Sequence, residues 1–159
     1  MTFSTPHHGH DACADAAEKR VEARASEAGK RLKDNHRIVF SILLSDHRAV
    51  GVYDIAARSE AHGKRLQPVQ IYRALETLME LGSVHRVESA NAYVACHSNH
   101  ACRRPQILIC TACERVSEMD SPKVQNALEQ ASLENGFVMT QQNIELRGLC
   151  PNCTGQPNA

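Results

Sequence analysis

The chain has 159 residues, 42% of them hydrophobic and 23% charged, and no apolar run approaches the roughly 20 residues that a membrane-spanning helix needs. Aromatic residues make up only 4% and tryptophan is missing, so we expect cores of Leu, Ile, Val and Ala, which often need a metal or a partner subunit for stability. The net charge is zero, yet residues 19–86 carry 13 Lys and Arg against 8 Asp and Glu, a basic bias that favours either a nucleic-acid partner or a solvated helical surface.

The N-terminal segment shows no targeting signal. Residues 1–18 contain no Lys or Arg and no apolar stretch, so they do not form a secretory signal, and a cytoplasmic location is expected. In that reducing compartment, seven cysteines favour metal ligands over disulfides. Residues 1–14 are expected to form a flexible tail, whose His7, His8 and His10 can bind a metal only weakly.

Four helices are predicted in the N-terminal half. The segment 15–32 is rich in Ala, Glu, Lys and Arg, which favours a first helix. A second helix begins at an N-cap provided by Asp34 or Asn35 and has apolar residues at helical spacing. Residues 51–57 predict a short third helix, and Gln67-Pro68 starts a fourth, because proline fits the first helical turn.

A hairpin follows the fourth helix. After a helix stop at Gly82, two short strand-like runs at 84–87 and 92–95 are joined by a compact turn at 88–91. Helices followed by such a hairpin indicate a winged helix-turn-helix domain, which we assign to residues 15–94.

The C-terminal half has a different pattern. Its predicted elements are strands at 106–109 and 115–118, a helix at 123–135, and strands at 137–140 and 143–149. They indicate a small α/β domain over residues 95–153, followed by a tail at 154–159. The predicted fold class of the whole chain is therefore α+β.

Two C-x-x-C pairs form the first candidate metal site. Cys110 and Cys113 are separated from Cys150 and Cys153 by 36 residues. Two such turns together offer a tetrahedral set of four thiolates, which suits Zn²⁺ and leaves no open coordination position. The site is therefore predicted to be structural, and zinc binding there adds to the folding free energy. The spacing does not match the usual iron–sulfur runs, and paired knuckles do not favour a redox disulfide.

A second cluster of possible ligands lies around the predicted domain boundary. Its members are His85, Cys96, His97, His100, Cys102 and Glu118. Cysteine, histidine and carboxylate together suit zinc, and ligands from both domains would fix the interdomain angle. The alternatives are that His85 is a surface or packing residue, that Cys96 is a small buried hydrophobe and that Cys102 is a free surface thiol.

Several motifs together resemble one family. Residues 69–75 are similar to a T-V-Y-R-A-L helix core, residues 82–89 to G-x-V-H-K-V-E-S, and residues 91–97 to N-x-Y-V-x-C-H. With the two cysteine pairs, the segment 30–153 resembles the ferric uptake regulator family, and within it the zinc uptake regulator branch. The resemblance implies an N-terminal winged-helix DNA-binding domain and a C-terminal dimerisation domain that binds metal.

The resemblance also implies a regulatory zinc site. Its ligands would be His85, Cys96, a loop histidine and Glu118. The loop is about one residue shorter here than in typical members, and arginines stand where the family histidine aligns. His100 is chosen as the loop ligand, and His97 and Cys102 stay open.

DNA contacts are expected from the fourth helix and its surroundings. The resemblance implies that Tyr72 and Arg73 touch DNA, and Arg65 and Arg37 would add contacts to the phosphates. Core packing is the competing interpretation for Tyr72. Of the L-T-P-Q-R segment that is common in the family, only Arg37 is shared.

The predicted function is a zinc-responsive transcriptional regulator. A homodimer holding two Zn²⁺ per subunit, one structural and one regulatory, would bind a double-stranded DNA operator and repress zinc-uptake genes. An enzyme is not expected, because neither H-E-x-x-H nor H-x-E occurs, and no small-molecule substrate is expected. The alternatives are a related sensor of iron, manganese or peroxide, and a zinc-ribbon module for protein interaction.

Overall fold

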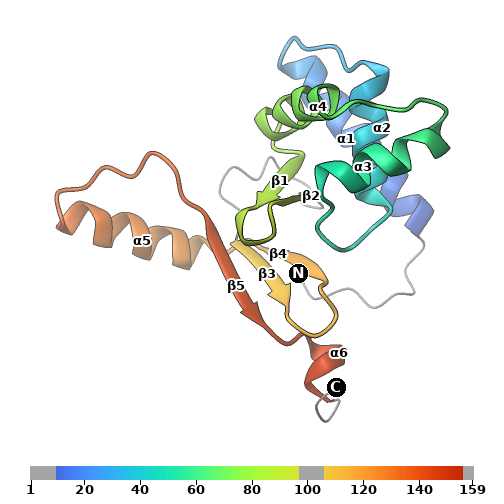
Figure 1. The fold of residues 1–159 in the computed structure, drawn as a ribbon. Coiled ribbons are helices and arrows are strands. Elements are labelled where there is room, and N and C mark those ends of the chain that lie inside the picture. The colour runs from blue at the N-terminus through green and yellow to red at the C-terminus, as the bar shows by residue number, and fades with distance from the viewer. Residues whose placement is uncertain (1–9, 97–105, 156–159) are drawn as a thin grey trace.

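The computed structural model describes residues 10–96 and 106–155 (Figure 1). The N-terminal elements are α1 (His10–Glu27), α2 (Asp34–Leu44), α3 (Val52–Ser59), the 3₁₀ turn η1 (Glu60–His62), α4 (Pro68–Glu80), β1 (Val84–Val87), the 3₁₀ turn η2 (Glu88–Ala90) and β2 (Ala92–Ala95). The C-terminal elements are β3 (Gln106–Cys110), β4 (Val116–Met119), α5 (Pro122–Glu134), β5 (Ile144–Gly148) and α6 (Pro151–Thr154). Within the described parts of the chain, no helix combines the length and the apolar character that crossing a bilayer requires.

The first helix differs from the prediction at both ends. It begins at His10, so part of the expected tail 1–14 is helical, while residues 1–9 lie outside the described residues. It ends at Glu27 and not at residue 32, because Gly29 adopts a left-handed conformation with φ of 65° and Lys30 N–H donates to the Ala25 carbonyl.

The second helix starts one or two residues earlier than expected. Its N-cap is Lys33, and neither Asp34 nor Asn35 caps it, because both lie inside the helix. The Lys33 backbone N–H donates to His36 Nδ1 at 2.8 Å, so the side chain of the third helical residue satisfies the N-cap amide.

The core of the N-terminal unit lies between α2, α3 and α4. Helix α4 buries one face through residues at helical spacing, among them Ile71, Leu75 and Leu78, which are completely buried. Pro68 occupies its first turn, and Gly82 follows its end with a φ of 61°. Burial of one face leaves the opposite face of α4 at the surface.

A hairpin completes the winged helix. Strands β1 and β2 are antiparallel, and we call residues 84–95 the wing. Val50 and Tyr93 exchange backbone hydrogen bonds of 2.8 and 2.9 Å, which ties the hairpin to the segment before α3. This arrangement confirms the predicted winged helix-turn-helix topology.

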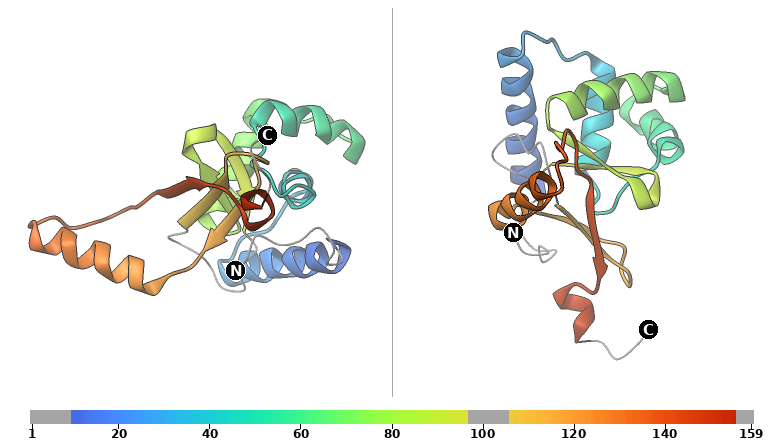
Figure 2. Two further views of the ribbon diagram at one scale, coloured as in Figure 1. Left: turned by 90° about the horizontal axis from the view of Figure 1, so that it is seen from below. Right: turned by 90° about the vertical axis from the view of Figure 1, so that its left-hand side faces the viewer.

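The C-terminal unit is a three-stranded sheet in the order β4-β3-β5. Strand β3 is antiparallel to β4 and parallel to β5, with α5 in the crossover between β4 and β5. Helix α5 projects away from the sheet and from the N-terminal helices, and none of its residues is buried (Figures 1 and 2). The fold class is thus α+β, as predicted.

The predicted strand at 137–140 is wrong. This segment connects α5 to β5 and pairs with no strand among the described residues. Phe137 and Val138 are 63% and 74% exposed. The apolar run has the composition of a strand, but it pairs with neither edge strand of the sheet, β4 or β5, and composition alone does not make a strand without a pairing partner.

Candidate metal centres and nucleic-acid surface

The four cysteines of the two C-x-x-C turns, which we call the knuckles, meet at one edge of the C-terminal sheet. Strand β3 ends at Cys110, which lies opposite Gly148 in the parallel register with β5. Because parallel strands end at the same edge, the turn after each strand places its C-x-x-C pair beside the other. One ligand atom from each of the four cysteines lies within 4.8 Å of all the others.

Backbone hydrogen bonds hold the two knuckles together. Thr111 donates its backbone N–H to the Gly148 carbonyl at 2.8 Å, and the Cys150 N–H donates to Cys110 Sγ at 3.3 Å. Burial opposes ionisation of the Cys110 thiol, but N–H donors from Cys113, Cys150 and Ala112 outweigh it and lower its pKa to about 6. A thiolate is the form that binds a metal.

The four sulfurs are not joined by disulfides. Cys113 Sγ and Cys150 Sγ are 3.7 Å apart, well beyond the bonded distance of about 2.0 Å, and all four cysteines are free. Four converging, partly or fully buried thiols with no competing bond fit a tetrahedral cation such as Zn²⁺.

A second group of ligand atoms spans the two units, and we call His85, Cys96 and Glu118 the cross-domain triad. Histidine comes from β1, cysteine from the end of β2 and glutamate from β4. His85 Nε2 lies 3.5 Å from Glu118 Oε1, and Cys96 Sγ lies 3.3 Å from Glu118 Oε2. One ligand atom of each lies within 4.8 Å of the other two, and all three side chains are buried.

The electrostatics of the triad suit a cation. Burial, together with the positive charge of Arg24, lowers the pKa of His85 to about 4, so its imidazole is neutral at neutral pH. Among the described residues, its Nε2 has no hydrogen-bond partner. A neutral imidazole, a thiol and a carboxylate packed together out of water form the donor set of a mixed zinc site.

The predicted loop ligands lie outside the described residues. His100, the chosen fourth ligand, and its alternatives His97 and Cys102 all fall within residues 97–105. The structure therefore brings together His85, Cys96 and Glu118 of the predicted set.

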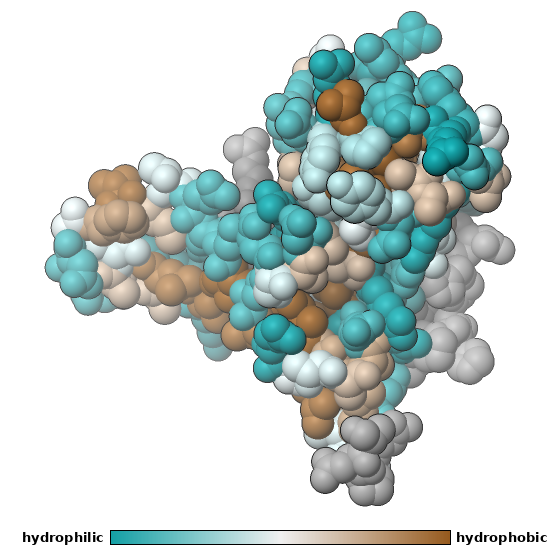
Figure 3. All heavy atoms as spheres, viewed as in Figure 1, coloured by the Kyte–Doolittle hydropathy of each residue, from teal (hydrophilic) through white to brown (hydrophobic). Residues whose placement is uncertain are grey.

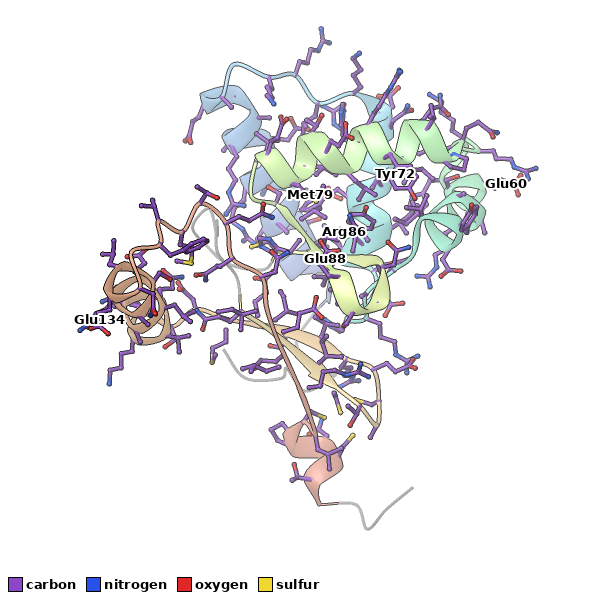
Figure 4. The ribbon with its side chains drawn as sticks, turned by 60° about the vertical axis from the view of Figure 1, so that its left-hand side comes forward. Glu60, Tyr72, Met79, Arg86, Glu88 and Glu134 are labelled. Atoms are coloured by element: carbon purple, nitrogen blue, oxygen red, sulfur yellow. The ribbon has the colours of Figure 1, made fainter. Side chains whose placement is uncertain are left out.

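The exposed face of α4 carries Tyr72 and Arg73. Tyr72 is 45% exposed, which excludes the alternative that it belongs to the core, and Figure 4 shows its position on the helix. Arg73 is exposed and has no carboxylate within ion-pair distance among the described residues. An aromatic ring and a guanidinium side by side on a surface helix can meet base edges in a major groove.

The two other predicted DNA-contacting arginines are engaged within the chain. Arg65 lies 3.5 Å from Glu60 Oε1. Arg37 pairs with Glu22 at 2.8 Å and lies 3.8 Å from Asp34. Both are exposed, so these surface pairs are weak and exchangeable.

Sequence reasoning missed two residues that join separate elements. Arg24 of α1 donates to the Gly82 carbonyl at 2.8 Å and to Ser83 Oγ at 3.2 Å, which connects α1 to the start of the wing. Glu145 of β5 accepts hydrogen bonds from the wing turn. Neither belongs to a local motif, so no signal in the sequence distinguishes them from other charged residues.

The fold joins a winged helix to a small sheet domain. One thiol cluster lies inside the sheet domain, and a second set of possible metal ligands is shared between the two units. These features define a class of winged-helix proteins with candidate metal centres. The Ferric uptake regulator family pattern matches residues 27–147. The chain belongs to the ferric uptake regulator family.

Comparison with named proteins shows which members of the family this chain is similar to. The Zinc uptake regulation protein of Escherichia coli (strain K12) is 29% identical over 135 residues, covering 84% of this chain and 79% of the relative. A structure described as a zinc uptake regulator complexed with zinc and DNA has 28% identity and a TM-score of 0.79, over 92% of this chain and 96% of that chain. The holo form of XcZur has 30% identity and a TM-score of 0.79, over 90% and 99%.

Proposed function

We propose that this chain is a zinc-responsive, DNA-binding transcriptional regulator that represses zinc-uptake genes when it is loaded with zinc. The observation that carries the proposal is the cross-domain triad, a buried set of nitrogen, sulfur and oxygen donors contributed by both units. The similarity to zinc uptake regulators, one of them in complex with zinc and DNA, supports it. The family is one of transcription regulators, not of enzymes.

Two zinc ions per subunit are proposed. The structural one is held by Cys110, Cys113, Cys150 and Cys153. The regulatory one is held by the triad and completed by His100 of the following loop. When bound, the regulatory ion supplies the charge that neutralises the Glu118 carboxylate and the Cys96 thiolate in a buried site.

The side chains of the triad then determine how the DNA-reading unit is oriented. His85 lies in the wing and Cys96 directly follows it, whereas Glu118 belongs to the C-terminal sheet. Holding the three together therefore fixes the wing, and with it α4, relative to the sheet. Tyr72 and Arg73 contact bases from α4, and Arg65 and Arg37 contact phosphates.

A homodimer follows from the exposed apolar surface of the C-terminal unit. Helix α5 buries none of its residues, and apolar side chains gather over α5 and the strand that follows it (Figure 3). The exposed apolar residues are Leu128 and Leu133 on α5, Phe137 and Val138 in the connection to β5, Leu146 on β5 and Leu149 directly after it. A surface of this kind fits a second copy of the chain, and a two-fold dimer would recognise a two-fold operator.

The expected domain division is retained as a proposal. Residues 15–94 would form the DNA-binding domain and residues 95–153 the dimerisation and metal-binding domain. Strand β2 ends at Ala95, one residue past this boundary. The cytoplasmic location expected from the sequence stays a prediction.

The chemistry of the triad favours zinc over the alternative signals. Iron and manganese sensors rely on nitrogen and oxygen ligands, whereas the buried Cys96 provides a soft thiolate. A zinc-ribbon interaction module would leave the winged helix and the surface pair Tyr72 and Arg73 without a role.

The test combines metal analysis with DNA binding. The purified protein is expected to contain two classes of zinc, of which a mild chelator removes one. DNA binding is measured on a duplex selected from a random-sequence pool by the zinc-loaded protein. Loss of affinity after mild chelation, with the fold retained by circular dichroism, supports the proposal. Unchanged affinity of the folded, chelated protein refutes it.

A further inference from the structure

The wing meets the C-terminal sheet along one row of side chains. Ile107 of β3 lies opposite Glu118 of β4 and also opposite Glu145 of β5. Side chains of directly opposed residues point to the same face of a sheet. The row therefore presents a carboxylate, an apolar side chain and a second carboxylate on one face.

Each member of this row contacts a different part of the wing. Ile107 packs with Val87 and Val94 in a buried apolar cluster. Glu118 lies against His85 and Cys96, as described above. Glu145 reaches the turn between β1 and β2, where Figure 4 shows Glu88 beside the C-terminal strands.

The contact of Glu145 is directional and charge-assisted. Its Oε1 accepts the backbone N–H of Glu88 at 2.6 Å, and its Oε2 accepts the N–H of Ser89 at 3.2 Å. Both N–H groups lie in the wing turn η2, outside the β1–β2 ladder. Hydrogen bonds from N–H groups to a carboxylate are about twice as strong as neutral ones.

Polar contacts on both sides of Ile107 help to orient the wing. The apolar contact of Ile107 is non-directional, so it permits the wing to rotate about the point of contact. Glu118 fixes the wing on the β4 side of Ile107, and Glu145 fixes it on the β5 side. A backbone hydrogen bond of 2.8 Å from the Val116 N–H to the His47 carbonyl, beside a bridge between Arg48 and Arg115, also joins the two units. Glu145 provides the polar contact on the β5 side, so its loss frees the wing turn to move relative to that strand.

We propose that Glu145 is a positioning residue, which holds the wing turn against β5 and, together with the cross-domain triad, sets the angle of the DNA-reading unit. This inference rests on the proposed function. Because both contacts stabilise one arrangement of the same two bodies, each strengthens the other. Loss of the Glu145 contact therefore weakens zinc binding at the triad as well as binding to DNA with two half-sites.

The variant Glu145→Gln tests the proposal, because it keeps the size of the side chain and removes its charge. Glu134→Gln is the control, with the same charge change on α5, remote from the wing (Figure 4). Because α5 belongs to the proposed dimer surface, sedimentation velocity must show the same dimer for both variants. Removing a negative charge by itself strengthens binding to DNA. If Glu145→Gln binds DNA more weakly and Glu134→Gln does not, the loss of DNA affinity cannot be caused by the change in charge, because that change alone would increase the affinity.

Two duplexes separate orientation from general DNA affinity. One is selected by the zinc-loaded wild-type protein from a random-sequence pool and carries two half-sites, and the other carries a single half-site. We expect Glu145→Gln to bind the two-half-site duplex roughly tenfold more weakly, as loss of one charged hydrogen-bonded contact implies. Binding to the single half-site should change by less than about twofold, because that binding does not depend on the interdomain angle.

Amide exchange gives a readout that does not involve DNA. In the zinc-loaded variant, the Ser89 amide should exchange faster than in the wild type, and zinc affinity at the triad should fall in a chelator competition. Glu145→Asp, which keeps the charge on a shorter side chain, provides a second variant, and an intermediate loss is expected.

The outcomes distinguish this inference from the proposed function. If the wild-type protein binds the selected duplex in a zinc-dependent manner and Glu145→Gln binds it equally tightly, the inference is overturned. If the wild type shows no zinc dependence, the proposed function fails, and the exchange rate at Ser89 alone decides whether Glu145 holds the wing turn.

Discussion

At the scale of single residues, burial and close packing make His85, Cys96 and Glu118 candidate metal ligands. His85 is buried beside Glu118, and burial with the nearby Arg24 charge lowers its pKa to about 4, so its nitrogen lone pair is available at neutral pH. Cys96 is 3% exposed and lies 3.3 Å from the same carboxylate. These contacts, not the presence of the residue types, make the triad a candidate metal site.

The residue with the clearest expected effect in the triad is Cys96. Cys96→Ser should abolish the zinc-dependent part of DNA affinity, because a serine hydroxyl is a much poorer zinc ligand than a thiolate. One of the two zinc ions expected per subunit should be lost, as measured by metal analysis. The circular dichroism spectrum should not change. If the variant retains full zinc-dependent DNA binding, Cys96 is not a ligand of the regulatory zinc.

Arg73 is the residue on α4 whose replacement should change sequence preference. Arg73→Lys loses the bidentate geometry of the guanidinium and should reduce discrimination between the selected duplex and single-base variants by about 1–3 kcal/mol. Arg37→Gln serves as the comparison, since a phosphate contact should weaken all duplexes equally. Fluorescence anisotropy over a set of duplexes measures both, and an unchanged preference in Arg73→Lys would exclude base contact.

At the scale of elements, the parallel pairing of β3 with β5 determines where the thiols meet. Strand β5 enters the sheet only after α5, yet its register sets Gly148 opposite Cys110. The turn that follows each strand then brings its cysteines to the same sheet edge. Closure of this site would link the two ends of the C-terminal unit, so zinc bound there would stabilise the whole sheet.

Cys150→Ser should therefore destabilise the C-terminal unit. Its side chain is completely buried and its backbone N–H donates to Cys110 Sγ, so loss of one ligand weakens both knuckles. Thermal unfolding should begin at a clearly lower temperature than in the wild type. Cys96→Ser, which removes a buried thiol from the other site, is the matched control, and equal unfolding temperatures in the two variants would contradict a structural role for the knuckles.

At the scale of the whole molecule, one subunit leaves an apolar surface uncovered. Helix α5 projects away from the rest of the subunit and buries none of its residues (Figure 2). Exposed apolar residues continue from α5 into β5, where Leu146 is 47% exposed. A second copy of the chain would cover this surface and present two copies of α4 to DNA.

Leu146→Glu should shift the protein from dimer to monomer, because a charge buried in an apolar interface is costly. Sedimentation velocity measures the change directly. Binding to the two-half-site duplex should fall with it, since the two reading heads are no longer joined. Tyr53→Glu places the same charge at an 81% exposed position on α3 and should leave the dimer intact. If the Leu146→Glu protein is still a dimer, the dimer interface does not include this surface.

The sequence determined the elements whose signals are local. Helical spacing, Pro68 and Gly82 predicted α4, and the turn between two short strands predicted the wing, because such signals act within a few residues. The cysteine spacing likewise singled out the four thiols. Local signals failed for the end of α1 and for the segment 137–140, whose apolar composition suggests a strand although it pairs with no strand among the described residues.

Only the tertiary structure decided which distant residues come together. The register of β3 with its two neighbours places Glu118, Ile107 and Glu145 in one row, and the packing of the wing on that row brings His85 and Cys96 to the first of them. Glu145 has no local signature, because its partners are backbone N–H groups 56 and 57 residues away. Such contacts depend on how two separately folded units pack together, which no short segment of the sequence encodes.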